Sequence, residues 1–131
     1  MKLFKTTTVL LLFTSLLFTA CKGKSGKDFI ANKWKMTNIS GEGAKDMSED
    51  EKKSMASSIV MDLTKDGKIN MTGMGESAKT GTWKLSDDAK TLFLTHDGED
   101  KAEPQEVNEL TAEKLVITDP KSKLVLSFSS K

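Results

Sequence analysis

Apolar and polar residues alternate along most of the chain from residue 28 onward. Successive side chains of a β-strand point to opposite faces, so strict alternation is typical of half-buried strands. The alternation predicts about eight strands of about five to seven residues each. The apolar side chains expected on the inward face are Trp34, Met36, Ile59, Met61, Leu63, Ile69, Met71, Trp83, Leu85, Leu92, Leu94, Val107, Leu110, Leu115, Ile117, Leu124, Leu126 and Phe128.

Turn residues separate these runs. Asp66 and Gly67 lie between the second and third runs, and an Asp-Gly pair is a strong signal for a β-hairpin. Asp87 and Asp88 lie between the fourth and fifth runs, where their side chains can close a turn. Connections this short make neighbouring strands antiparallel, and a meander of this length buries one face only by closing on itself. We therefore predict an all-β fold, a small eight-stranded antiparallel up-and-down barrel.

One segment departs from the alternation. Ser48 and Glu51 have the spacing of a capping box, in which each side chain binds the backbone amide of the other residue. This predicts one short helix over about residues 49–58, between the first and second strands. Its apolar face is poor, with Met55 as the main residue, and two glycines in the preceding residues 40–44 suit a hinge.

The first twenty residues have the pattern of a secretory signal. Two lysines precede a mostly apolar run over residues 9–18, which is shorter than the roughly 20 residues needed to span a bilayer. Residues 17–21 resemble the lipobox of bacterial lipoproteins, which ends in an acylated cysteine. Because Cys21 is the only cysteine, we interpret it as the lipidation site, carrying palmitate-type acyl chains. The alternative is an ordinary cysteine after a cleaved signal.

These features predict a lipoprotein signal peptide over residues 1–20, a lipidated tether over residues 21–28 and a barrel domain over residues 29–131. Buried acyl chains would hold such a domain on a membrane almost permanently. Lys22 follows the cysteine, and the absence of aspartate at this position favours the outer membrane of a Gram-negative envelope. The expected location is therefore the cell envelope, with a lipid anchor in the outer membrane.

Several of these segments together resemble a known family. The resemblance rests on residues 32–36 around the first tryptophan, the turn at 65–68, the Gly81-Thr82-Trp83 strand and residues 109–117. Together they resemble the lipocalin-like domain lipoproteins of Gram-negative bacteria, over about residues 28–129. The resemblance implies a lipocalin-like barrel with Trp34 near its closed end.

Charge argues against nucleic acid as a partner. All twenty basic residues are lysine, against nineteen acidic residues, and loss of Lys2 and Lys5 with the signal leaves a net charge of −1. Nucleic-acid-binding modules usually concentrate positive charge and use arginine for bidentate contacts. We expect a monomer whose macromolecular contact is the membrane, through the N-terminal lipid anchor.

The sequence contains little that suggests catalysis. His96 is the only histidine, and we interpret it as a solvated turn residue, because one histidine and an acylated cysteine cannot complete a zinc site. A serine hydrolase would have to use His96, and the chain has no Gly-x-Ser-x-Gly motif. We therefore predict no enzymatic activity, no metal and no cofactor.

Methionines are the most suggestive side chains on the inward positions. Flexible thioethers fill irregular space and also suit adaptable apolar binding surfaces. An eight-stranded barrel is just wide enough to be filled by side chains or to hold one small ligand, so a packed core and a ligand cavity both remain open. The residues expected to line this pocket or core are Trp34, Met36, Met61, Met71, Trp83, Leu92, Leu94, Leu126 and Phe128. Met55 and Ile59 are expected to belong to a lid over it.

Two main functions remain at this point, and an unrecognised enzyme is the third and least favoured hypothesis. The first is a membrane-anchored lipoprotein, on the periplasmic side or the cell surface, that binds a small apolar ligand. The second is a protein-interaction module with a filled barrel, acting as an envelope-assembly accessory or a hydrolase inhibitor.

Overall fold

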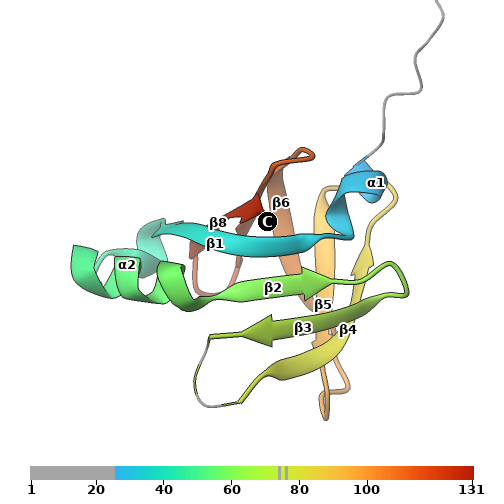
Figure 1. The fold of residues 1–131 in the computed structure, drawn as a ribbon, viewed down its shortest axis with the longest axis horizontal. Coiled ribbons are helices and arrows are strands. Elements are labelled where there is room, and N and C mark those ends of the chain that lie inside the picture. The colour runs from blue at the N-terminus through green and yellow to red at the C-terminus, as the bar shows by residue number, and fades with distance from the viewer. Residues whose placement is uncertain (1–25, 74, 76) are drawn as a thin grey trace, which may run out of the picture.

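The structure, a computed structural model, describes residues 26–73, 75 and 77–131. Eight antiparallel strands form a closed barrel in which each strand pairs with the next and β1 pairs with β8 (Figure 1). The strands are β1 (Lys33–Ser40), β2 (Val60–Leu63), β3 (Lys68–Thr72), β4 (Lys79–Leu85), β5 (Thr91–His96), β6 (Glu103–Leu110), β7 (Lys114–Thr118) and β8 (Val125–Ser130). This topology confirms the predicted eight-stranded up-and-down barrel. No helix in the described ranges is long and apolar enough to cross a membrane.

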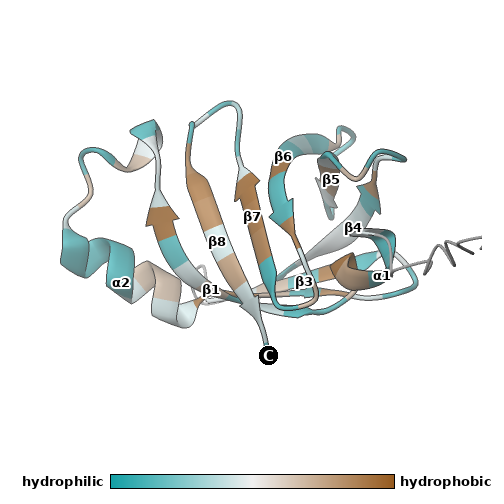
Figure 2. Cartoon of the chain, turned by 90° about the horizontal axis from the view of Figure 1, so that it is seen from above, coloured by the Kyte–Doolittle hydropathy of each residue, from teal (hydrophilic) through white to brown (hydrophobic). Residues whose placement is uncertain are grey.

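Two strands contain irregularities that change which residues face inward. The β1–β8 register shifts between Met36 and Asn38, so the buried residue after Met36 is Ile39 rather than the next residue of a strict alternation. The β6–β7 register shifts between Val107 and Glu109. Figure 2 shows that apolar and polar residues still follow one another along β1 and β8. The bulges therefore adjust the alternation locally without breaking the barrel.

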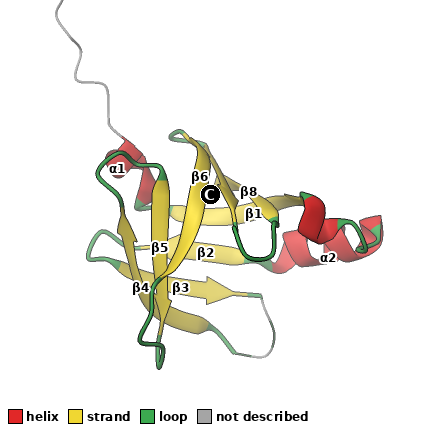
Figure 3. Ribbon diagram, turned by 180° about the vertical axis from the view of Figure 1, so that it is seen from behind, coloured by secondary structure: helices red, strands yellow, loops and turns green. Residues whose placement is uncertain are grey.

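The helix α2 (Glu49–Ser58) has the predicted bounds and the predicted capping box. The Ser48 backbone amide donates to Glu51 Oε2 at 2.7 Å, and the Glu51 amide donates to Ser48 Oγ at 3.2 Å. The helix connects β1 to β2 and lies beyond one end of these strands (Figure 3). The short 3₁₀ helix η1 (Glu42–Ala44) precedes it.

A second helix, α1 (Gly26–Ile30), was not predicted. It begins in the stretch predicted as the tether (21–28), extends two residues into the predicted barrel domain and lies at the opposite end of the barrel from α2 (Figure 1). Ile30 is fully buried, and Trp34 Nε1 donates to the Ile30 carbonyl at 3.0 Å. The helix therefore closes this end of the barrel. The predicted signal peptide and Cys21 lie outside the described residues.

A packed core fills the α1 end of the barrel. Its side chains come from six strands and from α1, and all are at least nine-tenths buried. They are Ile30, Trp34, Leu63, Ile69, Leu85, Leu92 and Leu115. Because this end is filled, space for a ligand remains only toward the α2 end.

Candidate functional site

A cavity of about 410 Å³ lies toward the α2 end of the barrel. This volume falls within the range of about 300–1,000 Å³ that is typical of small-molecule sites. Its lining residues are Met36, Ile39, Met47, Met55, Ile59, Met61, Met71, Lys79, Leu94, His96, Glu99, Glu103, Gln105, Ile117, Asp119, Leu124, Leu126 and Phe128. The barrel thus contains a packed core at one end and a cavity at the other, so the two alternatives from the sequence apply to different levels of the same barrel.

Six of the nine residues expected to line a pocket or core do line the cavity. They are Met36, Met61, Met71, Leu94, Leu126 and Phe128. Trp34 and Leu92 are fully buried in the core at the α1 end instead. Trp83 is half-buried and donates from Nε1 to the Thr64 carbonyl at 2.9 Å, so it does not reach the cavity.

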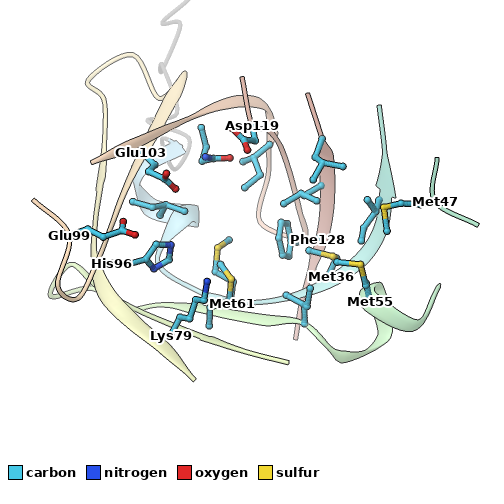
Figure 4. A pocket seen from close by; sticks show the side chains of 18 residues that line it. Met36, Met47, Met55, Met61, Lys79, His96, Glu99, Glu103, Asp119 and Phe128 are labelled. Atoms are coloured by element: carbon cyan, nitrogen blue, oxygen red, sulfur yellow. The ribbon is translucent and has the colours of Figure 1, made fainter. Parts of the chain in front are cut away.

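One side of the cavity is apolar and rich in sulfur. Met36, Met47, Met55 and Phe128 lie together on this side, where β1, β8 and α2 meet (Figure 4). Thioether side chains adjust their rotamers at low cost and are polarizable. This wall is therefore suited to apolar molecules of more than one shape.

The opposite side is polar, and the sequence analysis did not predict it. Lys79, His96, Glu99 and Glu103 lie on this side, on β4, β5, the following loop and β6 (Figure 4). Gln105 on β6 is 8% exposed and also lines the cavity. The inward alternation of β6 was obscured because two of its inward residues, Glu103 and Gln105, are polar.

His96 is not the solvated turn residue that we predicted. It is the last residue of β5 and shares the inward face with Leu92 and Leu94, since the strand extends two residues beyond the expected apolar run. Its Nδ1 atom is buried and has no hydrogen-bond partner within the described part of the chain. The sequence does contain a signal for the inward placement of His96. It follows Leu92 and Leu94 at the same spacing of two residues.

Gly81 on β4 pairs with His96 on β5. A Cβ atom at position 81 would lie 2.0 Å from the Thr95 carbonyl oxygen and 2.9 Å from His96 Cα. No side chain fits there without separating the two strands. The glycine therefore allows the close approach of β4 and β5 that holds His96 at the cavity.

Some of the charged groups around the polar side already have partners. Glu103 Oε1 pairs with Lys121 Nζ at 3.3 Å. The Asp119 carboxylate accepts from Ser122 Oγ at 2.7 Å and from the Lys121 amide at 3.0 Å, and the hydrogen bond from Ser122 is the main reason why the pKa of Asp119 is lowered. Within the described residues, no group of three or more histidine, cysteine or carboxylate side chains is arranged to hold a metal ion.

The two residues predicted for the lid have different surroundings. Ile59, the C-cap residue of α2, is 3% exposed, and its carbonyl accepts from the Met36 amide at 3.0 Å. It is therefore part of the fixed wall of the cavity. Met55 is 40% exposed and lines the cavity from α2, whose buried residue is Ala56. Of the two residues, Met55 is therefore the one that lies on the exposed helix beside the cavity.

The glycines before α2 are held in place rather than forming a free hinge. Gly43 donates from its amide to the Lys123 carbonyl at 3.1 Å. A Cβ atom at Gly43 would lie 2.1 Å from the Ser122 carbonyl, and one at Gly41 would lie 2.5 Å from that of Lys123. These glycines allow the segment to pack directly on the β7–β8 turn. The glycine segment is therefore fixed on the barrel by this contact.

Comparison with known proteins supports the fold. Residues 30–117 match the sequence model of a family described as a lipocalin-like domain, in agreement with the resemblance found in the sequence. A DUF4847 family protein from Bacteroides vulgatus ATCC 8482, known from a crystal structure, has a similar fold with a TM-score of 0.55. The two chains are 11% identical, and the alignment covers 79% of this chain and 94% of the other. No curated protein matches the chain.

Proposed function

Because this chain belongs to the lipocalin-like domain family and its barrel contains a cavity, we propose that it binds a small, largely apolar molecule inside the barrel. The observation that carries this proposal is the cavity of about 410 Å³ with a methionine-rich wall, next to a core that is already packed. An unfilled apolar wall lacks the dispersion contacts that a packed core has. A bound apolar molecule would supply these contacts. The proposal includes no catalytic step and no cofactor.

The filled-barrel alternative has less support. A protein-interaction module of that kind requires side chains that fill the barrel at both ends, as they do around Trp34. At the α2 end the inward side chains leave a cavity instead. We therefore prefer ligand binding to an envelope-assembly or inhibitory role.

A cavity-filling substitution tests the proposal. The apolar dye N-phenyl-1-naphthylamine is titrated into the purified Cys21→Ser chain, which lacks the acylation site. Leu126→Trp adds volume inside the cavity, and Val116→Trp adds the same side chain at a half-buried position of β7 that does not line it. We expect the dye to bind, Leu126→Trp to weaken binding by about tenfold or more, a loss of about 1.4 kcal/mol, and Val116→Trp to leave it unchanged. An absence of binding, or equal binding by both variants, would refute the proposal.

We further propose that Cys21 is acylated and anchors the protein in the outer membrane. The lipobox-like residues 17–21 and the apolar run over residues 9–18 support this proposal. Five residue steps separate Cys21 from the start of α1 at Gly26, and a fully extended chain of this length spans about 17 Å. The anchor would therefore keep the α1 end of the barrel near the membrane and the cavity at the far end.

Fractionation of the host cells tests the anchor. The wild-type chain is expected in the membrane fraction, and Cys21→Ser is expected in the soluble periplasmic fraction. Retention of Cys21→Ser in the membrane, together with unprocessed wild-type chain, would contradict the lipoprotein proposal.

A further inference from the structure

Two polar side chains of the cavity wall, those of Gln105 and His96, bear on the choice of ligand. Gln105 is 8% exposed, and its side-chain amide forms no hydrogen bond within the described part of the chain. His96 lines the same cavity, and its buried Nδ1 also lacks a partner there. Buried polar groups in folded proteins nearly always have a partner, so each exception needs an explanation. A ligand in the cavity can reach the Gln105 amide and the accessible edge of the His96 ring, whereas the buried Nδ1 atom itself is closed to the cavity.

The separation of the two side chains limits the ligand. Gln105 pairs with Leu92 across the β5–β6 ladder, and His96 lies four residues beyond Leu92 on β5. At about 3.3 Å per residue, the two positions are about 13 Å apart along the strand. The two side chains therefore extend from different levels of the barrel wall. A head group with more than one hydrogen-bonding group suits this spacing best.

The charges on this side indicate that these groups are uncharged. Glu99 and Lys79 line the cavity with opposite charges that offset each other, so they favour neither an anionic nor a cationic head group. Glu103 and Asp119 are already engaged by Lys121 and by the turn after β7, so they offer little to a cationic head group. Uncharged donors and acceptors therefore suit this wall best.

We propose that the ligand is a single-chain amphiphile with an uncharged head that carries several hydroxyl or ester groups, as in a monoacylglycerol. The head lies along the β5–β6 wall and bonds to His96 and Gln105. The acyl chain lies against Met36, Met55 and Phe128 on the opposite wall (Figure 4). This inference rests on the proposed function and adds the chemical class of the ligand.

A competition assay tests this assignment. N-phenyl-1-naphthylamine is bound to the Cys21→Ser chain and displaced by 1-monolauroylglycerol, laurate or dodecylamine, which differ mainly in the head group. The competition is repeated with Gln105→Leu and His96→Phe, which remove the polar groups and keep similar volumes. Asn70→Leu, an exposed amide on β3 outside the cavity, is the matched control.

We expect 1-monolauroylglycerol to compete at the lowest concentration. Each cavity variant should weaken its competition by about fivefold to tenfold, as expected for the loss of hydrogen bonds, and by more than it weakens binding of the dye. The control should change neither. Stronger competition by laurate or dodecylamine, or equal weakening of dye and competitor, would overturn the inference and leave the proposed function intact. Failure of the dye to bind at all would overturn both. The comparison of head groups uses no cavity variant, so it decides the question even where a variant does not fold.

Discussion

Trp34 and Trp83 are the only tryptophans, and the structure assigns them different contributions to stability. Trp34 is fully buried at the α1 end and donates a hydrogen bond to the Ile30 carbonyl, so it connects β1 to α1. Trp83 is half-buried and bonds to the Thr64 carbonyl beside the β2–β3 turn. Replacing each by alanine therefore compares a core position with a peripheral one.

The expected effects follow from burial. Truncating a fully buried tryptophan to alanine costs about 3–5 kcal/mol, because apolar contacts are lost and a cavity remains. For Trp83, about half of the side-chain burial and one hydrogen bond are lost, which together amount to about 2 kcal/mol. A domain of about 100 residues loses about 4 °C or more in melting temperature per kcal/mol. Trp34→Ala should therefore lower the melting temperature by at least about 12 °C, and Trp83→Ala by roughly half as much.

Thermal unfolding followed by far-ultraviolet circular dichroism measures both variants. Each also keeps one tryptophan as a fluorescent reporter of the remaining site. Trp34→Phe is the control, because it keeps most of the apolar volume, loses the hydrogen bond to Ile30 and should fall between wild type and Trp34→Ala. Equal losses for the two alanine variants, or an unchanged melting temperature for Trp34→Ala, would refute the assignment of the packed core to the α1 end.

Three further predictions concern the neighbourhood of the cavity. Gly81→Ala should lower the melting temperature and weaken dye binding, because its Cβ would collide with the Thr95 carbonyl; unchanged values in both assays would contradict the close β4–β5 approach. In hydrogen exchange, α2 should be less protected than β1 to β5 and should slow when the dye is bound, because its packing on the barrel is slight; protection equal to that of the strands would make it a fixed plug. Hydrogen bonds from the Ser48 amide and then the Ser48 hydroxyl lower the pKa of Glu51, so its contribution to stability is present at neutral pH and lost as the pH falls through this lowered value. In urea unfolding, Glu51→Gln should therefore be less stable than wild type at neutral pH and equal to it in acid, whereas a difference that persists in acid would exclude this carboxylate as the cause.

Local patterns were sufficient to predict most of the architecture. A period of two depends only on neighbouring residues, so it identified the strands and the inward positions of Met36, Met61 and Phe128. The helix α2 was equally predictable, because a capping box acts within four residues of the chain. The match to the lipocalin-like domain family agrees with the closed barrel that these patterns predicted.

Contacts between distant segments decided the rest. The helix α1 is too short to be stable alone and is held by Trp34 and by packing near Leu110. Period two also cannot tell whether an inward residue lies in the core or at the cavity, because this depends on the stagger of the strands around the barrel. For the same reason Leu92 is packed at the α1 end while Leu94, two residues later, lines the cavity. The burial of His96 Nδ1 without a hydrogen-bond partner among the described residues likewise depends on strands that are distant in the sequence, so the sequence alone did not predict it.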